Sequence, residues 1–227
     1  MSSFIKNLLL QFLALFFIRY AVIFHQLGGE FQINAFLFWG NVDLIRLVSA
    51  LGIIVSLMWL YSFFYKGHLV GNILLALVWS IMPILALFDV IHIYVVWISR
   101  LSVFIFLNVL SIEIIKDTED FENSVVFDNR SLTFLMGDWF TKWTIISINS
   151  AILFVPVAYH FFSPQKNISW LSLIYMLILM IAPVVYANIR VYRATVGNDF
   201  RVAGRLMRVV MVAGIGYCVG FSDLFFF

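Results

Sequence analysis

Residues 92–122 read HIYVVWISRLSVFIFLNVLSIEIIKDTEDFE, an apolar run that ends in a cluster of acids. The apolar part is long enough to cross a bilayer as a helix. On a helix, Glu113, Asp117 and Asp120 are spaced by four and three residues, so their carboxylates share one face. Because hydrocarbon would make such a face costly, it should line a polar cavity or reach the aqueous boundary. The stretch therefore predicts a membrane-spanning helix with a polar end.

The composition of the whole chain agrees with a membrane protein. The 227 residues are 63% hydrophobic and 11% charged, with a mean hydropathy of +1.03. A soluble domain of this size could not bury so much apolar surface, so lipid must be the main solvent and partner of the chain. The single cysteine, Cys218, excludes an internal disulfide. Nothing indicates a second, soluble domain, so residues 1–227 are expected to form one integral membrane domain.

Apolar runs of about 20 residues predict an all-α fold, a polytopic transmembrane helix bundle of about seven spans. The predicted spans are Ile5–Gln26, Leu44–Tyr65, Leu69–Phe88, His92–Ile115, Trp139–Phe162, Ile168–Arg190 and Val202–Phe221.

The positive charges predict the orientation of this bundle. When alternate ends of the seven spans are grouped, the only positively charged residues on one side are Arg46 and Lys166. Cytoplasmic loops carry an excess of lysine and arginine, so the opposite side, with the N-terminus and the acidic cluster, is expected to face the cytoplasm. That side collects Lys6, Lys66, Lys116, Arg130, Lys142, Arg190, Arg193, Arg201, Arg205 and Arg208. The longest polar stretch, Lys116 to Asp138, is predicted to be a cytoplasmic loop.

The acidic cluster has two interpretations. Carboxylates on one helix face suit a hard divalent cation such as Mg²⁺, together with a phosphate that the cation holds. Glu113, Asp117 and Asp120 would then be the metal ligands. Alternatively, the cluster is a solvated helix end, in which Lys116 pairs with Glu113 and Asp120. The spacing alone leaves both interpretations open.

A second candidate site precedes the third predicted span. Tyr61, Lys66 and Asn72 lie near the cytoplasmic mouth, where hydroxyl and ammonium groups could bind a phosphate. The alternative is an interfacial belt of aromatic residues with a snorkelling lysine. The sequence has no glycine-rich phosphate loop, zinc pattern or nucleophile elbow, and nothing in it supports nucleic-acid recognition.

Taken together, three patterns resemble the UbiA-type intramembrane prenyltransferases, particularly bacterial members of the digeranylgeranylglyceryl-phosphate-synthase-like branch. The first is Leu60-Tyr61-Ser62 with Lys66 and Gly71-Asn72. The second is the E-I-I-K-D-x-E-D form of Glu113 to Asp120, and the third is Ser131-Leu132-Thr133 with Gly137. The similarity extends from about Val48 to the C-terminus.

The resemblance implies that this chain corresponds to the last seven helices of a nine-helix bundle and lies in the bacterial inner membrane. Members of the family use Mg²⁺ to hold an isoprenyl diphosphate and transfer its isoprenyl group to a lipid or aromatic acceptor. Carried over to this sequence, the resemblance implies Glu113, Asp117 and Asp120 as metal ligands and Tyr61, Lys66, Asn72 and Lys116 as substrate-binding residues.

The chain departs from the family pattern at several positions. The first aspartate motif is absent, because Asn41 and Asp43 do not have its spacing, and Ser124 stands where the second motif has its last aspartate. With fewer carboxylates, the chain is expected to be a prenyltransferase homologue with weak or no activity as written. The alternative is a non-catalytic membrane protein that binds prenyl lipids or depends on a partner. A transporter is a weaker third option, since no repeat or pair of broken helices supports it.

Overall fold

The computed structural model describes residues 52, 56, 69–86, 91–123, 132–162, 170–195 and 197–220. Within this part of the chain all regular structure is helical, which confirms the predicted all-α class. The elements are α3 (Leu69–Ala86), α4 (Ile91–Asn123), α5 (Leu132–Phe162), α6 (Trp170–Met176), the π-helix η3 (Leu177–Ile181), α7 (Ala182–Arg193) and α8 (Gly197–Gly220).

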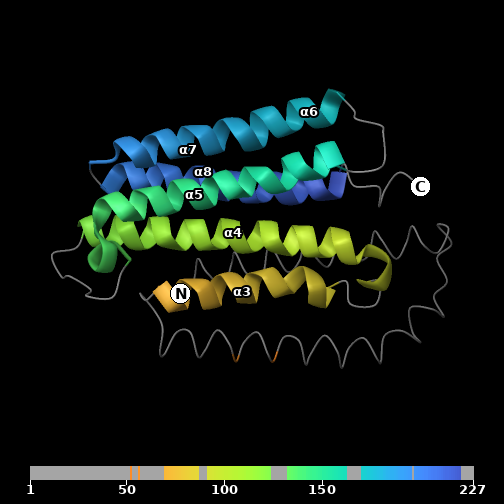
Figure 1. Ribbon diagram of the computed structural model, residues 1–227, viewed down its shortest axis with the longest axis horizontal. Coiled ribbons are helices and arrows are strands. Elements are labelled where there is room, and N and C mark those ends of the chain that lie inside the picture. The colour runs from red at the N-terminus through yellow and green to blue at the C-terminus, as the bar shows by residue number, and fades with distance from the viewer. Residues whose placement is uncertain are drawn as a thin grey trace.

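Four of the long helices form a ring. In order around it, α4 packs on α5, α5 on α7, α7 on α8 and α8 on α4, while α3 packs on the outside of α4 (Figure 1). Helices α6, η3 and α7 follow one another as a single rod. Neighbouring helices run in opposite directions, so the end of α4 lies beside the beginnings of α3, α5 and α8 and the end of α7 (Figure 1). The polar residues of several predicted motifs are thereby brought to one end of the bundle.

Among the residues that the structure describes, three helical stretches are long and apolar enough to cross a membrane. They are Ile98–Phe121, Leu132–Val157 and Trp170–Arg193, and a shorter apolar helix covers Leu69–Ile84. The helix that corresponds to the predicted last span, Val202–Phe221, is α8. The first two predicted spans, Ile5–Gln26 and Leu44–Tyr65, lie outside the described residues, apart from Gly52 and Ser56.

The predicted loop from Lys116 to Asp138 is wrong over much of its length. Helix α4 continues to Asn123 and α5 begins at Leu132, so only residues 124–131 between them lie outside the described part. Hydropathy marks where a span leaves the apolar core, whereas a helix needs only its backbone hydrogen bonds to continue. Glutamate and lysine are good helix formers, and the 3.7 Å ion pair between Lys116 and Glu113 supports the extra turns.

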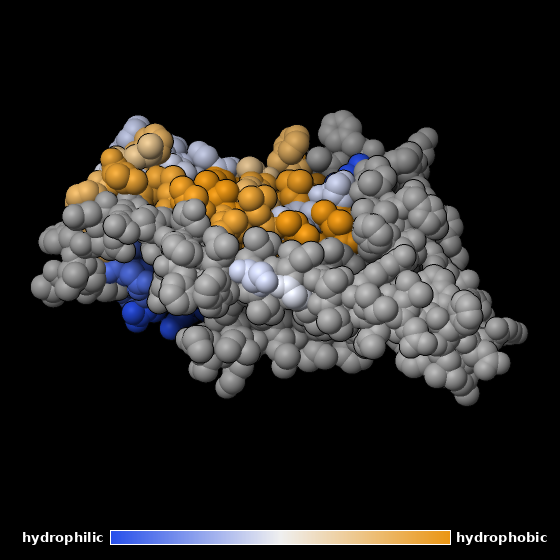
Figure 2. Space-filling model, turned by 90° about the horizontal axis from the view of Figure 1, so that it is seen from below, coloured by the Kyte–Doolittle hydropathy of each residue, from blue (hydrophilic) through white to orange (hydrophobic). Residues whose placement is uncertain are grey.

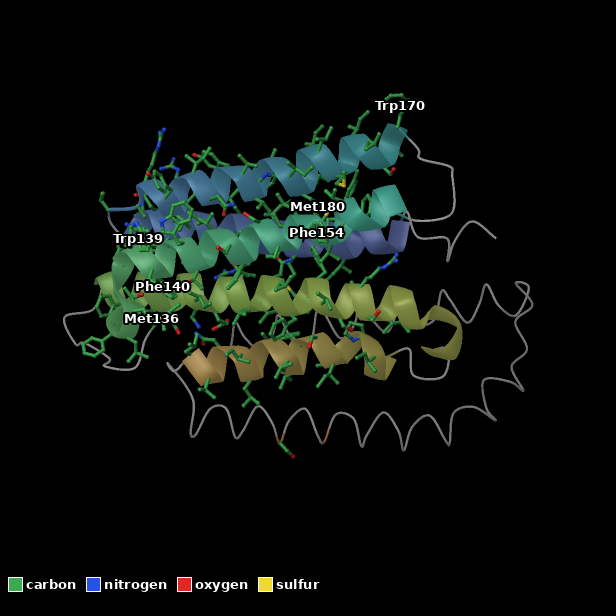
Figure 3. The ribbon with its side chains drawn as sticks, viewed as in Figure 1. Met136, Trp139, Phe140, Phe154, Trp170 and Met180 are labelled. Atoms are coloured by element: carbon green, nitrogen blue, oxygen red, sulfur yellow. The ribbon has the colours of Figure 1, made fainter. Side chains whose placement is uncertain are left out.

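Helix α5 is sharply bent at Gly137. This residue has φ 81° and ψ 163°, a backbone conformation that residues other than glycine rarely adopt. The bend turns the segment Leu132–Met136 away from the long part of α5. Met136, Trp139 and Phe140, on the two sides of the bend, are all exposed and lie at the same end of the bundle (Figure 3).

Helices α4 and α8 pack closely against each other in the core. A Cβ atom added to Gly214 would lie 2.0 Å from Cζ of Phe104, and one added to Gly204 would lie 3.4 Å from Cγ2 of Ile115. These two contacts, with Arg201 bonded to Glu119 beyond them, define an antiparallel register between the helices. The absence of side chains at both glycines therefore allows α8 to lie close against α4.

Figure 2 shows one face of the molecule coloured by hydropathy. Among the residues that it colours, a hydrophobic band runs along the bundle, and most of the strongly hydrophilic residues gather at the left. This is the end at which α4 finishes and α5 begins (Figure 1). Most of the charged residues in this view thus lie at one end of the bundle, as expected for helices that leave a membrane there.

Candidate functional site

The centre of the candidate site is a contact between α3 and α4. Asn72, in the first turn of α3, is 1% exposed, and its Nδ2 donates a hydrogen bond to Oδ2 of Asp117 at 2.6 Å. The other amide atom, Oδ1 of Asn72, is buried and has no hydrogen-bond partner within the described residues. Two side chains that the sequence assigned to separate motifs are therefore in direct contact.

The other predicted site residues on α4 differ in their exposure. On α4, Glu113 is half-buried and pairs with Lys116 at 3.7 Å, and Lys116 itself is exposed. Asp120 is also exposed. Tyr61 and Lys66 lie outside the described residues. The predicted pairing of Lys116 is thus confirmed for Glu113, and the structure brings Asn72 to the acidic face of α4.

Polar contacts also join the other helices at this end. Each helix of the ring is linked to its neighbour, and the Asn72–Asp117 bond adds α3 to the set. We call this set the polar collar. Its other members are Thr133 Oγ1 to Thr118 Oγ1 at 3.3 Å, Lys142 Nζ to the Ala194 carbonyl at 2.8 Å, Arg190 Nη1 to Asp199 Oδ1 at 3.1 Å and Arg201 Nε to Glu119 Oε1 at 2.7 Å.

The collar provides a hydrogen-bond donor for a backbone carbonyl that has no partner inside its helix. The last carbonyls of a helix have no partner inside it, and Lys142 donates to the carbonyl of Ala194 just after α7. The same ammonium group pairs with Asp138 at 2.6 Å. Charged groups of this kind are stable where water or a partner is available, so an aqueous boundary of the bundle is expected at the collar.

Deeper in the ring lies a second polar network, which the sequence analysis did not identify. Asn149 of α5 accepts a hydrogen bond from Oγ of Ser111 on α4, and its Nδ2 donates to Oδ1 of Asn188 on α7 at 2.8 Å. Ser111 and Asn149 are fully buried. The available signal was the presence of asparagines inside apolar spans, because an amide in hydrocarbon needs a partner.

Aromatic residues mark the two ends of the apolar zone. Trp143 makes edge contacts with Trp139 at 6.1 Å and with Tyr192 at 6.3 Å between ring centroids, and all three are exposed at the collar end. Trp170, 80% exposed, lies at the opposite end (Figure 3). The rise from Trp170 to Tyr192 is about 33 Å, close to the bilayer hydrocarbon thickness of about 30 Å. Such belts are typical of membrane interfaces.

The side chains around Asn72 include few possible metal ligands. In the part of the chain that the structure describes, no three histidine, cysteine, aspartate or glutamate side chains are grouped so that they could hold a metal ion by themselves. Mg²⁺, however, is commonly held by one or two carboxylates together with substrate phosphates. The Asp117 carboxylate and the unpartnered Oδ1 of Asn72 are oxygen atoms, the ligand type that Mg²⁺ prefers, but together they supply only one carboxylate.

Comparisons with protein-family models, curated proteins and solved structures found no match. The function is therefore inferred from the residues and contacts described above.

Proposed function

We propose that this protein is a UbiA-like prenyltransferase homologue that binds an isoprenyl diphosphate with Mg²⁺ at the collar end of α3 and α4. The observation that carries the proposal is the hydrogen bond between Asn72 and Asp117. It joins two of the sequence patterns on which the family resemblance rests, although they lie far apart in the chain. The orphaned Oδ1 of Asn72 beside the carboxylate supports the presence of a further, electropositive ligand.

Each residue of the site has a distinct role in this proposal. Asp117 supplies a carboxylate for the cation, and Asn72 orients that carboxylate by donating to Oδ2. Asp120 adds negative charge from the exposed side of the same helix. Lys116, with Lys66 and Tyr61, binds the phosphate oxygens. When bound, Mg²⁺ neutralises charge on the diphosphate and so assists its departure.

We further propose that transfer by the chain is weak. Departure of the diphosphate develops negative charge, which the family pattern offsets with cations held by two aspartate motifs. Here Ser124 replaces an aspartate of the second motif. Binding of the diphosphate should therefore be retained better than transfer of the isoprenyl group. Localisation to a bacterial inner membrane, with the collar end in the cytoplasm, belongs to the same proposal and is supported by the distribution of positive charge.

The proposal is tested by measuring binding of geranylgeranyl diphosphate to the purified full chain, with Mg²⁺ and with chelator. We expect Mg²⁺ to strengthen binding. Asp117→Asn should remove this strengthening, because the amide keeps the shape of the side chain but loses the charge that holds the cation. Asp138→Asn is the matched control: Asp138 lies at the same end, but its partner is Lys142. The site would be rejected if both variants lost the Mg²⁺-dependent strengthening equally, or if binding by the unmodified chain did not depend on Mg²⁺.

A second candidate function is favoured by one observation. Three of the acids of α4 already have protein partners, namely Glu113 with Lys116, Asp117 with Asn72 and Glu119 with Arg201. In a non-catalytic membrane protein these contacts would simply hold the helix ends together. The two functions differ in the binding assay described above, since only the first gives a Mg²⁺-dependent signal that Asp117→Asn removes.

A further inference from the structure

The outward face of α8 carries an arginine stripe followed by an apolar stripe. Arg201, Arg205 and Arg208 are spaced by four and three residues, so they share one side of the helix, and all three are exposed. On the same side, nearer the middle of the helix, Val209 is 50% and Val212 is 69% exposed. The face is therefore cationic toward the collar and apolar away from it.

The depth of these arginines follows from the register between α8 and α4. Arg201 bonds to Glu119 at 2.7 Å within the collar, while Gly204 lies against Ile115, one turn further into the bundle. With a rise of about 1.5 Å per residue, Arg205 lies about 6 Å and Arg208 about 10 Å deeper than Arg201. Both backbone positions are thus on the membrane side of the collar, and their long side chains can extend back toward the boundary.

The charges of the stripe are not balanced equally. Glu119 neutralises Arg201. Within the described residues, no salt bridge to an acid is found for Arg205 or Arg208. A guanidinium group stays protonated at any ordinary pH, and at membrane depth it needs an anion to offset its desolvation. This face of α8 points away from the ring, so an anion that balances the two charges would approach from the membrane side.

We propose that Arg205 and Arg208 bind the phosphate of an anionic glycerophospholipid, with one acyl chain lying along Val209 and Val212. Guanidinium groups bind phosphate oxygens through paired N–H donors, and two of them one turn apart can hold one phosphate. Charge complementarity selects an anionic lipid over a zwitterionic one. The order of the two stripes matches the order of headgroup and acyl chain in the leaflet on the collar side.

This site is separate from the one proposed for the isoprenyl diphosphate. Asn72 and Asp117 lie where α3 meets α4, whereas the arginines lie on the outward side of α8. The inference therefore does not rest on the proposed enzymatic function. It would hold equally for a non-catalytic membrane protein.

The experiment is native mass spectrometry of the purified full chain in detergent, titrated with phosphatidylglycerol and, in parallel, with phosphatidylcholine. We expect phosphatidylglycerol to be retained preferentially. Arg205→Gln with Arg208→Gln should weaken its binding by about tenfold or more, as expected for losing two charge-assisted contacts. Arg193→Gln, an exposed arginine in the last turn of α7, is the control for a simple loss of positive charge and should change little.

Three outcomes would overturn the proposal. One is equal retention of the two lipids, and another is the same loss of binding in the Arg193 control. The third is displacement of phosphatidylglycerol by geranylgeranyl diphosphate without Mg²⁺, which would assign the stripe to the isoprenoid instead. If the double variant does not fold, the single variants Arg205→Gln and Arg208→Gln decide, each with an expected several-fold weakening; no weakening in either would reject the site.

Discussion

Asn72 and Asp117 are 45 residues apart in the chain, yet the amide of one donates a 2.6 Å hydrogen bond to the carboxylate of the other. The bond connects the collar end of α3 to α4. It also leaves a buried amide oxygen beside a half-buried carboxylate. This arrangement can stabilise the helix pair, and it carries the cation site proposed above, so both properties can be tested with the same variants.

The first prediction is an energetic coupling between Asn72 and Asp117. Asn72→Ala should destabilise the protein by about 1–3 kcal/mol, because the carboxylate loses its donor. A double-mutant cycle with Asp117→Ala should give a coupling of about 1 kcal/mol, measured by thermal or denaturant unfolding in detergent. Asn72→Ala combined with Asp138→Ala should be additive within about 0.5 kcal/mol. Similar coupling in both pairs would mean that the Asn72–Asp117 bond is not specific.

The second prediction concerns the buried network at Asn149. Asn149→Ala should lower stability by about 1–3 kcal/mol, since Ser111 would lose its acceptor and Asn188 a donor. Ser150→Ala is the matched control, because that exposed hydroxyl donates a hydrogen bond to the Ile146 carbonyl of its own helix. Its effect should stay within about 0.5 kcal/mol. An Asn149 variant as stable as the control would show that the network contributes nothing.

The third prediction concerns the approach of α8 to α4. Gly214→Ala should destabilise by about 1–3 kcal/mol, because the new methyl group would overlap the ring of Phe104, which is only 2% exposed and has little room to move. Gly204→Ala should be tolerated, since its methyl group would meet Ile115 at 3.4 Å. Phe104→Leu should partly rescue Gly214→Ala. Failure of the rescue would indicate a different cause for the destabilisation.

The fourth prediction is the orientation in the membrane. In a Cys218→Ser background, a cysteine at Asn198, which is exposed at the beginning of α8, should react only with reagents that reach the cytoplasm. A cysteine at Gln165, outside the described residues, should react from the opposite side. The expectation rests on the positive-inside rule. Labelling of position 198 from outside would reverse the assignment of the collar end.

Features set within one helix could be predicted from the sequence. Hydropathy placed α3 at its correct first residue, Leu69, and the spacing of Glu113, Asp117 and Asp120 placed them on one helix face. The end of α4 and the beginning of α5 were missed, because apolar length measures membrane thickness and not helix length. The chain leaves the hydrocarbon before the helix stops, and α4 continues to Asn123.

Contacts between helices were decided only by the tertiary structure. The sequence marked Asn72 and Asp117 as members of separate patterns, but nothing in either pattern specified that they would bond to each other. Nor did it indicate that Asn149 would connect Ser111 with Asn188, or that Gly214 would face Phe104. The physical reason is a difference in range. The helical repeat determines which side chains share a face within a few turns, whereas the partner of that face depends on how all the helices pack together.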